Sequence, residues 1–153
     1  MSQQPSFRRY SKSLEKQLIR LQKKKYRKQE GLFIIEGYRS IEQIVQSGHI
    51  EIKALFVTPV FEAVPTTWTY INQFPPLLYR LSKQEMDTVT TTEEAPGFMA
   101  LCKLMEPLEL KDVRNTTFSR IVLCDRIQDP GNLGTMLRTA SWFGMDAVII
   151  GEG

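Results

Sequence analysis

Hydrophobic residues recur along the chain in short segments whose spacing predicts alternating helices and strands. Leu14, Leu18 and Leu21 stand at positions i, i+4 and i+7, which predicts an amphipathic helix from Ser11 to about Lys28. Apolar runs of four to seven residues predict buried strands at 32–35, 52–57, 77–81 and 98–104. The alternation predicts a compact α/β domain over residues 29–106, preceded by the helical segment 1–28.

Two shorter helices are expected between these strands. Ile41, Ile44 and Val45 share one face of a helix that begins after Gly37 and ends at Gly48. The run 82–85, Ser-Lys-Gln-Glu, matches a capping box and predicts a helix start at its serine. Residues 88–96 read as a polar loop, and the proline-containing stretch 61–76 has no clear period.

A second pattern of strand, helix and strand follows a polar segment, 107–119, that reads as a linker. The apolar runs 121–124 and 147–150 predict buried strands on either side of a helix from Leu133 to Phe143. A right-handed crossover would make these two strands parallel. Two parallel strands alone do not make a stable sheet, so residues 120–153 are expected to be the beginning of a larger domain. The chain is therefore expected to be an N-terminal fragment.

Charge is distributed unevenly between the beginning and the rest of the chain. The net charge is +3, yet residues 1–28 contain ten basic residues and one acidic residue, whereas the remainder carries −6. No apolar run approaches the roughly 18–20 residues of a membrane span. Two cysteines and one histidine are too few for a four-ligand zinc site or a disulfide framework, and no signal peptide is visible, which favours a reducing, cytoplasmic location.

The basic residues of the first helix fall opposite its leucines and form a candidate nucleic-acid surface. Such a stripe suits a phosphate backbone, RNA or DNA, because binding to it comes largely from charge neutralisation. A solvated helix face, a membrane-surface helix and an organellar transit peptide are alternative interpretations of the same segment. The candidate RNA-binding residues are Lys16, Arg20, Lys23, Lys24, Arg27, Lys28 and Arg39.

Several other conspicuous residues are given structural roles. His49 follows a glycine and is expected in a surface turn, and Cys102 and Cys124 are expected to be buried in strands. The aromatic residues of the stretch 61–76 are expected to anchor the core or a loop rather than stack on bases; these are Trp68, Tyr70 and Phe74. Core packing is also expected of Met136, Leu137 and Trp142.

The richest motif, Asp125 to Ala140, lies between a predicted strand and a predicted helix, where α/β sheets place their sites. It lacks the Gly-Lys-Ser/Thr ending of a P-loop and the G-x-G-x-x-G of a dinucleotide site. Asp125 and Asp129 are an acidic pair, but loop aspartates usually cap helices, so no metal site is expected.

The run D-P-G-N-L-G-T-M-L-R-T-A, followed by Trp-Phe-Gly, resembles the first motif of the SpoU/TrmH family, which comprises S-adenosylmethionine-dependent RNA ribose 2′-O-methyltransferases of the knotted SPOUT fold. Residues 25–41 and 96–100 independently resemble the start and the end of the family's ribosomal-protein-like substrate-binding domain. The expected fold is therefore a small α/β RNA-binding domain followed by the first βαβ unit of an incomplete SPOUT domain.

The resemblance assigns the family's catalytic asparagine and arginine to Asn132 and Arg138. It implies S-adenosylmethionine as methyl donor, ribosomal RNA as the favoured substrate with transfer RNA second, and a homodimer. The family's second and third motifs are expected beyond Gly153, so the chain alone is expected to be catalytically incomplete. A non-enzymatic RNA-binding module and a nucleotide-dependent enzyme of Rossmann type are the rival interpretations.

Overall fold

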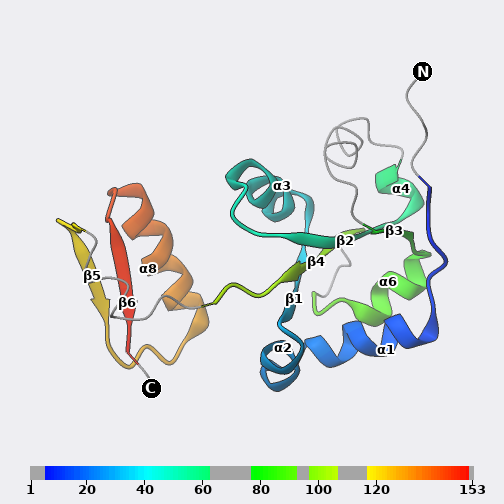
Figure 1. Ribbon diagram of the computed structural model, residues 1–153, viewed down its shortest axis with the longest axis horizontal. Helices are drawn as coiled ribbons and strands as arrows, with labels where there is room; N and C mark the ends of the chain where they lie inside the picture. The colour runs from blue at the N-terminus through cyan, green and yellow to red at the C-terminus, as the bar shows by residue number, and fades with distance from the viewer. Residues whose placement is uncertain (1–5, 63–76, 93–96, 107–116, 152–153) are drawn as a thin grey trace. The chain divides into compact units, whose positions relative to one another are not determined.

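Two compact units, residues 1–106 and residues 107–153, make up the chain in a computed structural model (Figure 1). The structure describes residues 6–62, 77–92, 97–106 and 117–151. The aromatic residues Trp68, Tyr70 and Phe74, and most of the predicted linker, lie outside these described residues. The basic helical segment belongs to the same unit as the α/β domain that follows it.

Unit 1 is built on a four-stranded sheet in the order β1-β4-β2-β3. The strands are β1 (Leu32–Glu36), β2 (Ile52–Val57), β3 (Leu77–Arg80) and β4 (Phe98–Lys103). β4 pairs antiparallel with both β1 and β2, whereas β2 and β3 are parallel. The two central strands, β2 and β4, are almost wholly buried because helices cover both faces, which explains their continuous apolar runs.

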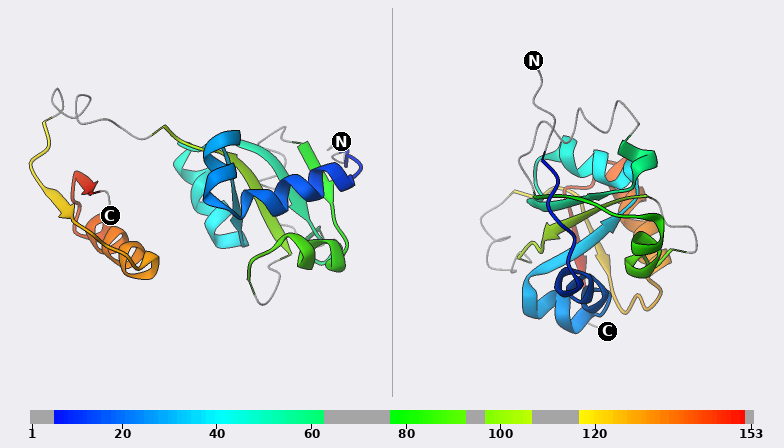
Figure 2. Two further views of the ribbon diagram at one scale, coloured as in Figure 1. Left: turned by 90° about the horizontal axis from the view of Figure 1, so that it is seen from below. Right: turned by 90° about the vertical axis from the view of Figure 1, so that its right-hand side faces the viewer.

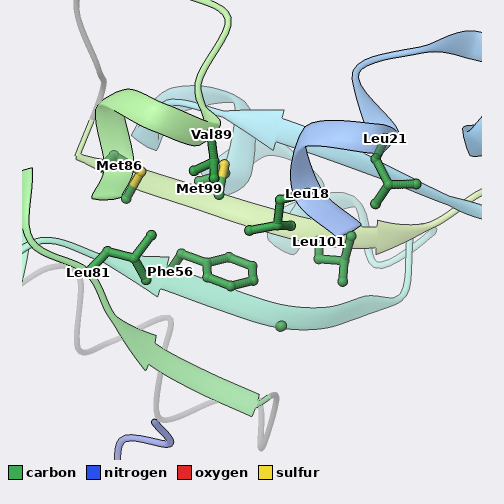
Figure 3. Close-up of a cluster of buried hydrophobic side chains, with 9 residues drawn as sticks. Leu18, Leu21, Phe56, Leu81, Met86, Val89, Met99 and Leu101 are labelled. Atoms are coloured by element: carbon green, nitrogen blue, oxygen red, sulfur yellow. The ribbon is translucent and has the colours of Figure 1, made fainter. Parts of the chain in front are cut away.

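Helices cover both faces of this sheet (Figure 1). On one face lie α1 (Lys12–Leu21) and α6 (Lys83–Val89), which bury Leu18, Leu21, Met86 and Val89 against alternate residues of β2 and β4 (Figure 3). Figure 2 shows α1 lying across this face when the molecule is seen from below. On the other face lie α3 (Tyr38–Ser47) and α4 (Pro59–Glu62).

The first helix is shorter than predicted. α1 ends at Leu21, Lys23 is extended, and a separate helix α2 (Lys24–Glu30) follows, so the prediction of one helix to Lys28 is wrong. The stripe of leucines also ends at Leu21, so further turns of α1 would have no apolar face with which to pack on the sheet. Two carbonyl oxygens at the end of α1 instead accept hydrogen bonds from Arg27 Nη1, at 3.1 and 2.6 Å.

Most other boundaries in unit 1 follow the sequence pattern. Gly48 adopts the left-handed conformation that ends α3, and Ser82 and Glu85 form the predicted capping box of α6. The predicted loop at 88–96 begins too early, because α6 continues to the fully buried Val89. Cys102 is fully buried as predicted, and burial raises the pKa of its thiol to about 12.

Unit 2 consists of β5 (Ile121–Cys124), α8 (Pro130–Trp142) and β6 (Ala147–Ile150), and its two strands are parallel as predicted. Cys124 is buried as predicted. Other predictions for its core are wrong. Ile121 and Leu123 of β5 are 46% and 70% exposed, and β6 is only partly buried, with Ile150 50% exposed, so neither strand is buried as predicted. The predicted core residues Met136, Leu137 and Trp142 are 41%, 39% and 91% exposed, since one helix on two strands buries only a narrow stripe.

Candidate functional site

The predicted RNA-binding lysines lie on exposed surfaces of α1 and α2. Lys16, Lys23, Lys24 and Lys28 are exposed and come from two helices that contact each other. The sequence-based candidates omit Lys25, which is also exposed and lies 6.0 Å from the centre of the Tyr26 ring. These five exposed lysines of two neighbouring helices are called here the α1–α2 basic surface, because exposed ammonium groups suit a phosphate backbone.

The arginines predicted to join this surface are partly engaged within unit 1. Arg20 forms an ion pair with Glu30 at 2.9 Å, and its guanidinium lies 4.8 Å from the centre of the Tyr26 ring. Arg27 is half-buried and caps α1 as described above. Arg20 and Arg27 keep their positive charges, but contacts within the protein fix the orientation of their guanidinium groups.

Arg39 is not brought together with the other candidates. It is exposed on the first turn of α3, and α3 packs on the face of the sheet opposite α1. His49, predicted to be a surface residue, is exposed after the end of α3.

The glycine-containing motif of unit 2 folds as the sequence predicts, into a loop and the start of α8. The helix begins three residues earlier than predicted, at Pro130, because Asp129 is its N-cap: Asn132 N donates to Asp129 Oδ1 at 2.6 Å. A Cβ atom added at Gly131 would lie 3.0 Å from this same Oδ1. A glycine at this position therefore leaves room for the capping carboxylate.

Arg138 lies back along α8 toward the start of the helix. Its Nη2 donates to Thr135 Oγ1 at 3.0 Å, and this hydroxyl donates to Gly131 O at 3.0 Å. A Cβ atom at Gly134 would lie 3.4 Å from Arg138 Nη1, an ordinary van der Waals contact, so the position of the guanidinium does not require a glycine here. The bond to Thr135 pre-positions Arg138 while it is still exposed.

Among the described residues, no hydrogen bond joins Asn132 and Arg138. They are six positions apart on one helix, which is about 240° around its axis. Asn132 is exposed in the first turn, and its backbone N–H serves the helix cap. The structure therefore places Asn132 in the first turn of α8 and Arg138 in its second half, on a different side of the helix.

The loop before α8 meets the ends of both strands. Gly151 N donates to Cys124 O at 2.8 Å, and a Cβ atom at Gly151 would lie 3.0 Å from Asp125 Oδ1. Arg126 follows with a φ of 54°, a left-handed conformation that is uncommon outside glycine and asparagine. This edge therefore combines carboxylate, guanidinium and backbone groups beside the start of α8. Sequence reasoning gave Arg126 no role, since a lone arginine in a loop carries no pattern.

The opposite edge of unit 2 is fixed by Asp146. Its carboxylate accepts hydrogen bonds from the backbone N–H groups of Arg120 and Ser119, at 2.8 and 2.9 Å, and these bonds lower the pKa of Asp146. The start of β5 is thus tied to the turn before β6, and Ser119, the last residue of the predicted linker, already belongs to this unit.

Comparisons with known proteins agree with the resemblance seen in the sequence. The family described as "MRM3-like substrate binding domain" matches residues 15–100. The 23S rRNA (guanosine(2553)-2′-O)-methyltransferase RlmP of Bacillus subtilis (strain 168) is 34% identical over 134 residues, which are 88% of this chain and 49% of that protein. The mitochondrial rRNA methyltransferase 3 of Xenopus tropicalis is 30% identical over 151 residues, 93% of this chain and 34% of that protein.

Solved structures match both the fold and its order of elements. The crystal structure of an RNA 2′-O ribose methyltransferase superimposes with a TM-score of 0.74 at 29% identity, covering 94% of this chain and 54% of that one. A putative RNA methyltransferase of the TrmH family from Porphyromonas gingivalis gives a TM-score of 0.76 at 28% identity, with coverage of 95% and 54%. The chain spans about half the length of the Bacillus relative and about a third of that of the Xenopus relative.

No helix in the ranges that the structure describes is both long and apolar enough to cross a membrane.

The family match covers more than half of the chain, and the relatives and solved structures extend the similarity through α8. The chain therefore belongs to the MRM3-like substrate-binding domain family, and its similarity to RNA methyltransferases continues beyond that domain.

Proposed function

We propose that this chain supplies the RNA-binding domain and the first catalytic motif of an S-adenosylmethionine-dependent RNA ribose 2′-O-methyltransferase. The observation that carries the proposal is Arg138, which is exposed yet held by Thr135 in the Asn-x-Gly-x-x-x-Arg turn. Ribosomal RNA is the favoured substrate, because the named relatives are rRNA methyltransferases, and transfer RNA is the second candidate.

The reaction transfers a methyl group to a ribose 2′-oxygen, which is a poor nucleophile while protonated. Arginine practically never deprotonates in proteins, so Arg138 acts by its charge rather than as a base. Its guanidinium can hydrogen-bond the 2′-oxygen and the neighbouring phosphate together, which stabilises developing negative charge and leaves the phosphate to accept the proton. Asn132, on another side of the same helix, is proposed to orient the ribose.

The methyl donor that the resemblance implies is S-adenosylmethionine, whose sulfonium supplies the methyl group when it is bound. The described residues of unit 2 do not fit this donor by themselves. Their open groove, about 310 Å³, is apolar: its lining includes Val122, Met136 and Phe143 and contains no ionisable side chain to pair with the donor's amino and carboxylate groups. We therefore expect these 153 residues, tested alone, to transfer no methyl groups.

The test is Arg138→Ala in the complete protein, measured by transfer of radiolabelled methyl groups to ribosomal RNA. Methyl transfer should fall at least about a hundredfold, the usual cost of losing one charge-stabilising donor. RNA affinity should stay within about twofold. Arg120→Ala is the matched control, since Arg120 is an exposed arginine at the opposite edge of the same unit.

Either of two results would count against the enzyme proposal. Full methylation by the Arg138→Ala protein would remove Arg138 from the chemistry. Tight RNA binding by a complete protein that never methylates RNA would favour the rival interpretation, a non-enzymatic RNA-binding module.

We also propose that the complete protein is a cytoplasmic homodimer. The thiols of Cys102 and Cys124 are free, which suits a reducing compartment, and Trp142 and Phe143 are 91% and 70% exposed, as interface side chains are in a separated subunit. Sedimentation of the complete protein checks the dimer: a monomer at micromolar concentration would exclude it.

A further inference from the structure

A pocket in unit 1 has no role in the function proposed above. It lies between the α1–α2 turn and the edge strand β1, with a volume of about 320 Å³. Its walls include Leu21, Gln22, Arg27, Phe33, Glu36 and Leu104. This volume is at the lower end of the range for small-molecule sites, roughly 300–1,000 Å³, so it suits a single flat ring system rather than a long ligand.

The polar groups of the walls are fixed by contacts with other elements. Gln22 Nε2 donates to Val89 O at 3.2 Å, and Arg27 Nη1 donates to the two carbonyl oxygens that end α1. The carboxylate of Glu36 accepts hydrogen bonds from the hydroxyls of Thr90, Thr91 and Thr92 and from the backbone N–H of Thr91. The pocket is therefore held in shape without a ligand.

Arg27 retains donors that can reach a ligand. A guanidinium has five N–H groups. The bonds that cap α1 use only Nη1, and no residue in the described ranges accepts from Nε or Nη2. Those two nitrogens form the planar fork that recognises two neighbouring acceptors.

The charges in the pocket favour a nucleobase over a phosphate. Glu36 is an anion there and would repel a phosphate. Its oxygens already accept the threonine hydrogen bonds, so recognition of a base falls to Arg27. Guanine presents two neighbouring acceptors, O6 and N7, that match an arginine fork. Leu21, Phe33 and Leu104 supply the apolar and aromatic contacts that an unstacked base needs.

We propose that this pocket binds one guanine base extruded from the RNA strand that the α1–α2 basic surface holds. The proposal rests on the RNA-binding function proposed above and adds base recognition to it. Lys23 and Lys24 directly follow Gln22, which lines the pocket, so a strand whose phosphates contact these lysines passes close to it.

The test uses the 153-residue chain and two single-stranded RNAs of about 12 nucleotides, one of uridine only and one with a single central guanosine. The guanosine RNA should bind about tenfold more tightly, as expected for one buried and stacked base. Replacing guanosine by 7-deazaguanosine, which lacks N7, should remove most of this preference.

Two variants separate the pocket from the charged surface. Leu104→Trp fills the pocket without changing charge, and Arg27→Lys keeps the charge but lacks the fork; both should bind the two RNAs equally, with the salt dependence of the wild type. Val60→Phe, an apolar enlargement at an exposed position of α4, is the matched control and should keep the preference. Thermal unfolding checks that each variant is folded.

The outcomes distinguish the two proposals. Equal binding of both RNAs by the wild type, with steep salt dependence, overturns the guanine pocket and leaves the RNA-binding proposal standing. A preference that survives in both Leu104→Trp and Arg27→Lys also overturns the pocket. Weak, salt-independent binding of both RNAs overturns the RNA-binding proposal itself.

Discussion

At the scale of single residues, Gly97, directly before β4, has the least room for a side chain among the described glycines. A Cβ atom there would lie 2.6 Å from Phe61 Cδ2 and 2.9 Å from Thr58 Oγ1, and φ is +65°. Phe61 stacks on the buried Phe98, so it cannot move aside freely. We expect Gly97→Ala to lower the free energy of unfolding by about 3 kcal/mol, combining backbone strain with overpacking.

Gly48→Ala is the matched control, because Gly48 has nearly the same φ, +66°, with nothing within 4 Å of its added Cβ atom. Its cost should be about 1 kcal/mol, from the left-handed backbone alone. Urea denaturation measures both variants, and equal destabilisation would show that the contact with Phe61 is unimportant.

Glu36, also considered at the scale of single residues, makes the stability of the fold depend on pH. Burial alone would raise its pKa, but the hydrogen bonds from Thr90, Thr91 and Thr92 lower the pKa below its ordinary value of 4.5. A carboxyl group whose pKa is lower in the folded state stabilises the fold above its unfolded pKa, and this contribution is lost as the pH falls through the folded pKa. We expect Glu36→Gln to cost about 2 kcal/mol at pH 7, the usual value for hydrogen bonds to a charged group.

The cost of Glu36→Gln should begin to shrink as the pH falls below the ordinary carboxyl pKa of 4.5, and it should vanish once the pH is below the lowered pKa of the folded carboxylate. Urea denaturation of both proteins between pH 7 and pH 3 measures the difference. Glu51→Gln is the control, since that carboxylate is fully exposed and its ion pair with Lys53 lies on the surface. A cost for Glu36→Gln that is independent of pH would contradict this explanation.

At the scale of elements, the α1–α2 basic surface should bind RNA chiefly through its charge. Removing one lysine–phosphate ion pair reduces the slope of log affinity against log salt by about 0.7 for single strands and 0.9 for duplexes. The double variant Lys23→Ala, Lys24→Ala should therefore reduce the slope by about 1.5, with weaker binding at every salt concentration. Lys53→Ala is the control, because Lys53 is paired with Glu51 at the start of β2. Equal slopes for the wild type, the double variant and Lys53→Ala would exclude the α1–α2 basic surface as the site of RNA binding.

The elements also show which features of the fold and the site a sequence can predict. Periodicity predicted the bounds of α3, β2 and β6 well because a glycine or a proline closely follows each apolar pattern. The break between α1 and α2 was missed because it depends on Arg27 capping carbonyls five and six residues before it, a contact that no local period encodes. The candidate site also combines what the sequence can predict with what it cannot. The motif located Arg138 and Asn132, but only the structure shows that Thr135 positions the arginine. Likewise, only the structure shows that Arg39 lies on the face of the sheet opposite α1.

At the scale of the whole molecule, the two units differ in how much they bury. Unit 1 encloses two clusters of buried apolar side chains, one on each face of a four-stranded sheet. Within the described part of unit 2, only Cys124 and Ala140 are buried apolar residues, and the sheet has two strands. Two strands with one helix bury little apolar surface, so this unit should open far more readily than the first.

Hydrogen exchange of the 153-residue chain measures this difference directly. Amides of β2 and β4 should exchange only when unit 1 unfolds as a whole, because both strands are hydrogen-bonded on two sides and buried on two faces. Amides of β5 and β6 should exchange at least about a hundredfold faster, which corresponds to an opening free energy lower by about 3 kcal/mol. Equal protection in the two units would mean that unit 2 is stabilised by packing beyond its own helix and strands, and apolar side chains such as Trp142 and Leu123 would be the first places to look for it.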